Sequence, residues 1–247
     1  MNLETSMDSH VDLVELENAD LGSRSERAAI RHAPIPKIPP GAPWNATEEV
    51  ILRRRSIRKY KPVQVPAHLV RRIVELGRFA PSQGNCQPWS FVVVRDRDLL
   101  EKMEAHCVGV CKFVMATPEY ANVHPVPALA ISNIASGRFR VFHKAPTVIL
   151  ILMDKRGVGV PEVDVGIVGQ NIVLGAQSLG LGTCWIGFSK FLNGNAALMQ
   201  TLGIAPPFEI VEAITVGWPF GVPSLNTVER QTHEIAWFED GRKEVFY

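Results

Sequence analysis

RRRSIRKY at residues 53–60 and APSQGNCQPW at residues 80–89 are the two stretches that decide the fold of this chain. The first places several guanidinium groups and a serine hydroxyl within five residues. Guanidinium groups bind phosphate oxygens through paired hydrogen bonds. In the second, Pro81 and Gly84 favour a tight turn that also carries a hydroxyl and three side-chain amides. Together the two stretches predict opposite sides of a pocket for a phosphorylated, planar ligand.

Each stretch also has an ordinary explanation when it is taken singly. A short basic run after a helix is commonly a solvated surface, since cations are favoured at helix C-termini. A polar turn between a helix and a strand needs no ligand either. Only further motifs, found in a consistent order along the chain, decide in favour of a binding site.

The composition is that of an ordinary globular protein. The chain has 247 residues, of which 46% are hydrophobic and 21% charged, and this suits one large domain or two small ones. The formal net charge of +1 argues against a nucleic-acid partner and against binding to an anionic membrane, because both need a broad basic field. The basic residues near 53–61 are therefore a local concentration.

The four cysteines fit neither a disulfide scaffold nor a zinc ribbon. The acidic start of the chain lacks the apolar core of a signal peptide, and the apolar runs elsewhere are too short or too interrupted to cross a bilayer. We therefore expect a cytoplasmic protein without a membrane partner. Cys107 and Cys111 lie four residues apart with His106 adjacent, but these groups do not fill a tetrahedral site, and no metal is expected.

Residues 1–46 differ from the rest of the chain. They are of mixed charge and then rich in proline, which indicates an extended arm or a disordered leader. Such a leader either makes no specific contact or wraps around a partner subunit, and the sequence leaves both open. We expect residues 47–247 to form the functional domain.

The spacing of apolar residues predicts the regular elements of this domain. Helices are expected at 47–54, 66–79, 96–113, 163–180 and 193–202, and strands at 91–94, 147–153, 183–187 and 209–217. Helices alternating with buried strands favour an α+β or α/β sandwich. The helix at 163–180 is apolar nearly all round, so it must be covered on every side, by its own sheet or by another subunit.

A third motif, LGLGTCWIG at residues 179–187, supplies glycines that end a helix and flank a short strand. These glycines allow the backbone to approach a flat ligand closely. The motif is not a dinucleotide-binding fingerprint, because no glycine-rich turn joins a strand to a following helix in the required order. The sequence contains no phosphate-binding P-loop either.

Five motifs, in this order and spacing, resemble the FMN-dependent nitroreductase family. They are RRSIR at 54–58, APSQGNCQPW at 80–89, KAP at 144–146, GQN at 169–171 and LGLGTCWIG at 179–187. The resemblance covers roughly residues 47–235. It implies an α+β fold with a mostly antiparallel sheet flanked by helices, and an intertwined homodimer with FMN at the subunit interface. The family's long central helix packs against its partner, which would explain the apolar helix described above.

The same resemblance implies which residues bind FMN. Those at the phosphate and the ribityl chain are Arg54, Arg55, Ser56 and Arg58. Those that line the flavin from the other subunit are Pro81, Ser82, Gln83 and Asn85. Backbone near the reactive N5 atom comes from Ile186 and Gly187. Arg230 is a further phosphate contact, although Glu229 stands beside it where many members have a second basic residue.

A cation is also expected at the N1/O2 edge of the flavin, because reduced flavin carries negative charge at N1. Arg138 is the preferred candidate and Arg140 is the alternative, and either arginine can equally be an exposed loop residue. Three residues of the irregular stretch 116–142, which also contains these arginines, are candidates for lining an acceptor pocket: Tyr120, His124 and Phe139.

The resemblance also implies the reaction. NADH or NADPH gives a hydride to flavin N5 and leaves, and a second substrate then takes the electrons in the same place, which is a ping-pong mechanism. The second substrate would be a nitroaromatic, a quinone or another small aromatic electron acceptor. No catalytic acid or base is named, because the protein supplies position and electrostatics. Two alternatives stay open: a specialised member (a flavin reductase, a reductive dehalogenase or a substrate-oxidising flavoenzyme) and an FMN-binding module without turnover.

Overall fold

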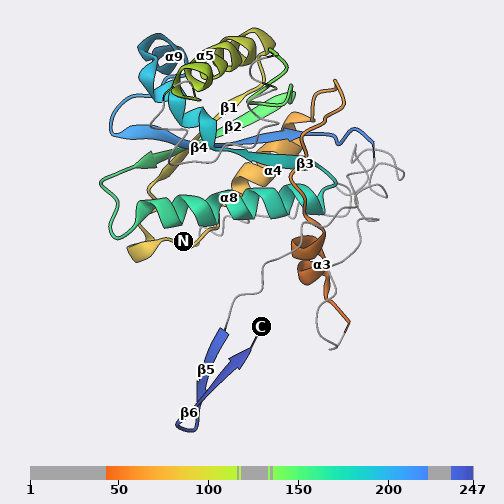
Figure 1. Ribbon diagram of the computed structural model, residues 1–247, viewed down its shortest axis with the longest axis vertical. Helices are drawn as coiled ribbons and strands as arrows, with labels where there is room; N and C mark the ends of the chain where they lie inside the picture. The colour runs from red at the N-terminus through yellow and green to blue at the C-terminus, as the bar shows by residue number, and fades with distance from the viewer. Residues whose placement is uncertain (1–42, 116, 118–132, 134–135, 222–234, 247) are drawn as a thin grey trace, which may run out of the picture.

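The computed structural model of the chain describes residues 43–115, 117, 133, 136–221 and 235–246. In this part, one sheet lies between two layers of helices (Figure 1). One face of the sheet is covered by α4 (Ala67–Arg78) and α8 (Pro161–Ser178). The other face is covered by α5 (Arg97–Met115), the 3-10 helix η2 (Gly187–Gly194) and α9 (Ala196–Thr201).

The sheet has four strands in the order β1 (Trp89–Val94), β2 (Thr147–Asp154), β4 (Phe208–Gly217) and β3 (Gly182–Ile186). Every neighbouring pair is antiparallel. The pairing of β2 with β4 shifts register between Ile151 and Leu152, which marks a bulge. The mostly antiparallel α+β fold expected from the sequence is therefore confirmed, and the α/β alternative is excluded.

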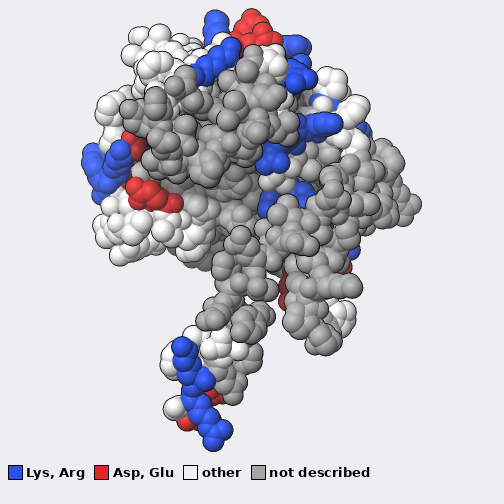
Figure 2. Space-filling view, in the orientation of Figure 1, with Lys and Arg blue, Asp and Glu red and all other residues white. Residues whose placement is uncertain are grey.

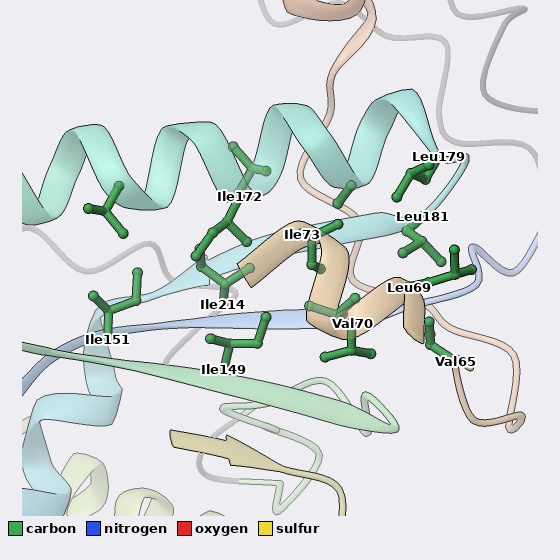
Figure 3. Packing of buried hydrophobic residues seen from close by; sticks show 14 of the residues in the cluster. Val65, Leu69, Val70, Ile73, Ile149, Ile151, Ile172, Leu179, Leu181 and Ile214 are labelled. Carbon is green, nitrogen blue, oxygen red and sulfur yellow. The ribbon is translucent and has the colours of Figure 1, made fainter. Parts of the chain in front are cut away.

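Glycines allow α8 to approach its neighbours closely. A Cβ atom on Gly169 would lie 2.0 Å from the ring of Trp185 on β3, and one on Gly175 would lie 2.6 Å from the side chain of Leu76 on α4. On this face of the sheet, apolar side chains of α4, α8 and the strands form one core cluster (Figure 3). Because α8 fits this tightly, its position fixes that of β3.

Most elements lie where the apolar pattern predicts them. The strand expected at 147–153 is β2, and its apolar side chains are buried on both faces. The helix expected at 66–79 is α4, and the one expected at 163–180 is α8. The helix expected at 193–202 is wrong in extent, because η2 reaches Gly194 and α9 covers only Ala196–Thr201.

The first described helix, α3 (Ala46–Arg53), begins before its expected start. Asn45 is its N-cap in place of Thr47: the Asn45 side chain accepts a hydrogen bond from the Glu48 backbone N–H at 3.0 Å. Glu48 returns the contact, since its carboxylate accepts the Asn45 N–H at 2.7 Å. This reciprocal pair is a capping box, which satisfies two backbone donors that a helix end leaves unpaired.

A hairpin near the C-terminus was not expected from the sequence. Strands β5 (Ile235–Glu239) and β6 (Arg242–Phe246) pair with each other in a separate antiparallel sheet. They expose Trp237 and Phe238. Figure 2 shows Lys and Arg side chains along this hairpin, with acidic side chains beside them near its tip. A two-stranded hairpin is only marginally stable by itself.

Among the described residues, no helix is both long and apolar enough to span a membrane. The leader, residues 1–46, lies outside the described residues except for its last four positions. The expected role of this leader therefore stays a prediction.

We predict that Gly169→Ala lowers the free energy of unfolding by about 1–3 kcal/mol, because the added methyl group would overlap the Trp185 ring and force repacking. Gly109→Ala is the matched control. Gly109 is an exposed glycine of α5 with open space around it, so alanine there should add about 0.5–1 kcal/mol of helix stability. Denaturant unfolding of both variants measures the difference. Equal effects of the two substitutions would contradict the close packing of α8.

Candidate functional site

The basic segment lies along the outer edge of β3. Ser56 forms a parallel β-bridge with Thr183, and the Ile57 N–H donates to the Thr183 carbonyl at 2.8 Å. The Ile57 side chain is buried and packs directly on Gly182, where a Cβ atom would lie 2.9 Å away. With Ile57 turned inward, Ser56 and Arg58 are exposed, as the alternation of an extended segment requires.

Tyr60 fixes the far end of this segment. Its hydroxyl donates to the Ile57 carbonyl and lies 2.7 Å from Thr215 Oγ1 on β4. The Lys61 N–H donates to the Trp218 carbonyl at 2.8 Å. Burial raises the pKa of the Tyr60 hydroxyl, so it stays protonated and able to donate. The segment is therefore held at both ends by the sheet.

Three of the residues expected to bind FMN lie near enough to the Cys184 thiol on β3 to affect its pKa. Burial raises the pKa of this thiol, while hydrogen bonds from Arg58 and Ser56 and the charges of Arg58 and Arg54 lower it. Cys184 was not singled out from the sequence, because a cysteine within an apolar motif is usually a buried core residue. The period of two along β3 could have signalled it, since Trp185 faces α8 and its neighbour must face the other way.

Arg55 makes a different kind of contact. Its Nη1 donates to the carbonyls of Leu52 at 2.7 Å and of Arg54 at 2.8 Å. Both carbonyls belong to the C-terminal end of α3, which leaves such groups without helical partners. Arg55 thus closes the end of α3 and fixes how the chain enters the basic segment.

The loop between α4 and β1 has a tightly defined shape. It contains the 3-10 helix η1 (Gln83–Asn85), and Asn85 and Gln87 have left-handed backbone with φ of 54° and 48°. The Ser82 hydroxyl accepts the Gln87 N–H at 2.9 Å, and the Asn85 side chain accepts from the Gln87 amide at 3.1 Å. These local hydrogen bonds explain why asparagine and glutamine stand here.

In one chain, this loop and the basic segment lie at opposite ends of α8 (Figure 1). The side chain of Gln83 lies against Gly159, just before α8 begins. The basic segment contacts Gly182 and Thr183, just after α8 ends. At 1.5 Å per residue, the 18 residues of α8 separate the two by about 27 Å. The structure therefore does not bring the two halves of the expected pocket together within one subunit.

At the end of β3, Ile186 is buried and Gly187 is exposed. The carboxylate of Glu212 lies beside Gly187, since a Cβ atom on this glycine would be 3.4 Å from Glu212 Oε1. Burial raises the pKa of Glu212 and the charge of Lys190 lowers it. No motif in the sequence pointed to this carboxylate, because it lies on β4, outside the predicted motifs.

Arg138 and Arg140 are both exposed, and both make local contacts. Arg138 Nε donates to the Ser136 hydroxyl at 3.0 Å. Arg140 Nη1 donates to the carbonyls of Gly137 and Phe139 at 2.9 and 2.8 Å. Phe139 packs edge-on against the Phe188 ring, with centroids 6.0 Å apart. These contacts do not show which of the two arginines is the better candidate for the N1/O2 edge of the flavin.

Glu104 on α5 anchors the chain that follows these arginines. Its two carboxylate oxygens accept the backbone N–H groups of Val141 at 2.7 Å and Phe142 at 2.9 Å. The next residue, His143, is half-buried, and its backbone is left-handed with φ of 53°. Burial and the nearby charge of Arg58 lower the pKa of His143 to about 4. Neither Glu104 nor His143 was singled out from the sequence.

Other chemical features lie away from this edge. A cavity of about 480 Å³ lies between the loop before β1 and the turn after β2, lined by Cys86, Gln87, Pro88, Asp154, Arg156, Gly157, Val158 and Phe208. Cys107 and Cys111 are free, buried thiols whose pKa burial raises. No cluster of potential metal ligands occurs in the described part of the chain. Arg230, Tyr120 and His124 lie outside the described residues.

The sequence model of the nitroreductase family matches residues 51–218. The chain belongs to the nitroreductase family. This membership confirms the resemblance seen in the motifs, and it covers the basic segment, the loop before β1 and all of β3. The match ends close to the last residue of the main sheet, before the C-terminal hairpin.

The chain is similar to two curated relatives over most of their length. A Methanothermobacter thermautotrophicus protein assigned as an NADH dehydrogenase/NAD(P)H nitroreductase is 31% identical over 184 residues, which are 72% of this chain and 78% of that one. A 4-nitrobenzoate reductase of Nocardioides sp. is 26% identical over 204 residues, 70% of this chain and 80% of its own. An FMN-dependent nitroreductase structure from Clostridium difficile superposes with a TM-score of 0.60 at 27% identity, covering 77% of this chain and 99% of its own.

We predict that the folded chain loses stability as pH falls from 6.5 towards 4, in part through His143. The unfolded chain takes up a proton near the ordinary pKa of 6.5, whereas the folded chain does so only near 4, so acid favours unfolding in this window. His143→Gln should therefore lose less stability than the wild type between these two pH values. His68→Gln, at an exposed histidine of α4, is the control. Parallel pH profiles for the wild type and His143→Gln would refute the assignment.

Proposed function

We propose that the chain is an FMN-dependent oxidoreductase, which takes reducing equivalents from NADH or NADPH and passes them to a nitroaromatic, a quinone or a related small aromatic acceptor. The observation that carries the proposal is the basic segment 54–58, which is hydrogen-bonded along the β3 edge at Thr183 and exposes Ser56 and Arg58. Membership of the nitroreductase family and the names of the relatives support the same class of reaction.

The residues at the β3 edge fit the chemistry of FMN. Ser56 and Arg58 are exposed, and together with Arg54 they provide hydroxyl and guanidinium donors for a phosphate dianion. At the other end of β3, Gly187 is exposed and presents backbone without a side chain of its own. An anion receptor and an unobstructed length of backbone are the two features that a phosphorylated, planar cofactor requires.

When bound, FMN supplies an N5 atom that accepts a hydride from the nicotinamide and then reduces the second substrate in a ping-pong cycle. The protein's own part is to bind and to orient. In this proposal, Arg54, Arg55, Ser56 and Arg58 would bind the phosphate and the ribityl chain, with Arg230 as a further phosphate contact. Ile186 and Gly187 would place backbone near N5, and Arg138 would place positive charge at the N1/O2 edge. Residues 47–247 then form the FMN-binding domain.

We infer that a second copy of the chain completes each site as a homodimer. The loop that carries Pro81, Ser82, Gln83 and Asn85 lies about 27 Å from the basic segment of its own chain, which is longer than an FMN molecule. Large exposed apolar side chains are available for the contact on α8 and at the end of α4, including Val163 and Phe79. A two-fold arrangement of α8 against α8 would place the loop of one subunit at the basic segment of the other.

The reaction is tested by one spectroscopic experiment. We predict that the purified protein binds FMN and shows a yellow chromophore, which bleaches on anaerobic addition of NADH or NADPH and recovers on addition of 4-nitrobenzoate or a quinone. Stopped-flow absorbance with each nicotinamide separately gives the preference between them. If the protein binds flavin but neither nicotinamide bleaches it, the protein is an FMN-binding module without turnover. A chain that stays colourless in excess FMN would refute the proposal.

The shared site is tested by mixing two inactive variants. Arg58→Ala removes a phosphate ligand, and Asn85→Asp places a negative charge on the loop while keeping a residue that tolerates left-handed backbone. Each variant alone should lose bound FMN. If one site uses both segments from different subunits, random heterodimers restore one intact site each, and flavin occupancy returns at about a quarter of all sites.

Lys59→Ala is the control for Arg58→Ala, since it removes an adjacent exposed cation on the opposite face of the extended segment. It should keep its FMN. Mixtures in which flavin occupancy does not rise above that of the separate variants would show that each site is built from one chain.

A further inference from the structure

A tight turn of unusual composition lies next to the basic segment. It spans residues 142–145, and the Ala145 N–H donates to the Phe142 carbonyl at 2.9 Å. Its two central residues, His143 and Lys144, have φ of 53° and 55°. Positive φ at both positions is the signature of a type I′ turn, which glycine, asparagine and aspartate normally occupy. Positive φ is uncommon for residues other than glycine, so contacts with the surrounding structure help to hold His143 and Lys144 in this conformation.

Glu104 imposes this conformation. Its carboxylate accepts the N–H groups of Val141 and Phe142, the two residues that lead into the turn. The side chains of both residues are buried in the core beneath. Hydrogen bonds to a charged acceptor are among the stronger ones in proteins. The turn is thus fixed from α5, an element that takes no part in the expected FMN contacts.

The chain beyond the turn runs beside the continuation of the basic segment. Tyr60 and Pro146 both pack on Gly217, where a Cβ atom would lie 2.7 Å from one ring and 2.9 Å from the other. Gln64 Nε2 donates to the Pro146 carbonyl at 2.9 Å. The turn therefore lies at the same end of the sheet as Tyr60, which follows Arg58 by two residues, and the charge of Arg58 contributes to the lowered pKa of His143.

The two central side chains of the turn differ in burial. Lys144 is exposed, whereas His143 is half-buried. With a pKa of about 4, the His143 ring is neutral near pH 7, so it offers one N–H donor and one nitrogen acceptor. Arginines already supply the charge that a phosphate needs. A neutral group that both donates and accepts instead suits a hydroxyl, which has the same two properties.

We propose that His143 is a cofactor-binding residue, which the Glu104-anchored turn holds in place to hydrogen-bond a ribityl hydroxyl of FMN beside Arg58. The proposal rests on the proposed function, in that it takes FMN as the ligand of the basic segment. It extends the binding site to a residue outside the family motifs, and it assigns Glu104 as the positioning residue behind it.

The experiment is a titration of the apoprotein with FMN and with riboflavin, followed by quenching of flavin fluorescence. His143→Ala should weaken both ligands by the same factor of about tenfold, as expected for one hydrogen bond, because both carry the ribityl chain and only FMN carries the phosphate. His143→Gln, which keeps a donor and an acceptor, should recover most of the affinity. Glu104→Gln should weaken both ligands in the same ratio as His143→Ala. Lys144→Ala is the matched control, since it changes the exposed residue of the same turn, and it should bind as the wild type does.

The outcomes separate this proposal from the one on which it rests. A wild-type chain that binds neither flavin refutes the proposed function. A wild-type chain that binds FMN, with unchanged affinity in His143→Ala, refutes only the role of His143. Loss of FMN affinity alone, with riboflavin unaffected, would also overturn it, because the contact would then be to the phosphate. Thermal melting of each apo variant separates lost binding from lost folding, and rescue by His143→Gln excludes a purely structural role.

Discussion

The close packing of α8 between the sheet and α4 is the constraint on which the rest of this structure depends. Gly169 brings the helix onto the Trp185 ring, and Gly77 on α4 brings the two helices together at Ile172. With Trp185 turned towards α8, the neighbouring Cys184 must face the opposite side of the sheet. Cys184 is accordingly buried in the core on that side. The packing of one helix therefore decides which residues of β3 face each of the two cores.

The length of α8 then separates the two stretches that define the family. The basic segment is held at the β3 edge by backbone hydrogen bonds and by Tyr60, and the loop before β1 is held at the start of α8. Neither can move towards the other without breaking these contacts. A pocket that uses both is therefore a property of two subunits, which is why we place the flavin at an interface between copies of the chain.

Much of the fold could be predicted because burial leaves a periodic trace in the sequence. The uninterrupted apolar run of β2 predicted a strand, and the one-sided apolar pattern of α4 predicted a helix. The predicted first and last residues lie close to those of the two elements. Other features leave weaker traces. The cap at Asn45 was missed because Thr47 is also a good cap and only the chain geometry chooses between them. The hairpin at 235–246 was missed because its apolar residues do not alternate cleanly with polar ones.

The sequence by itself determined the family, the chemistry of the basic segment and the order of helices and strands, because these depend on residue types at short spacing. The tertiary structure decided which distant groups meet. It set Glu104 beneath Val141 and Phe142, His143 within the influence of the Arg58 charge, and Glu212 against Gly187. Such pairs are separated by many residues and are joined only when strands and helices pack, so no local pattern records them. For the same physical reason, only the folded chain shows that the two halves of the expected pocket lie a helix length apart.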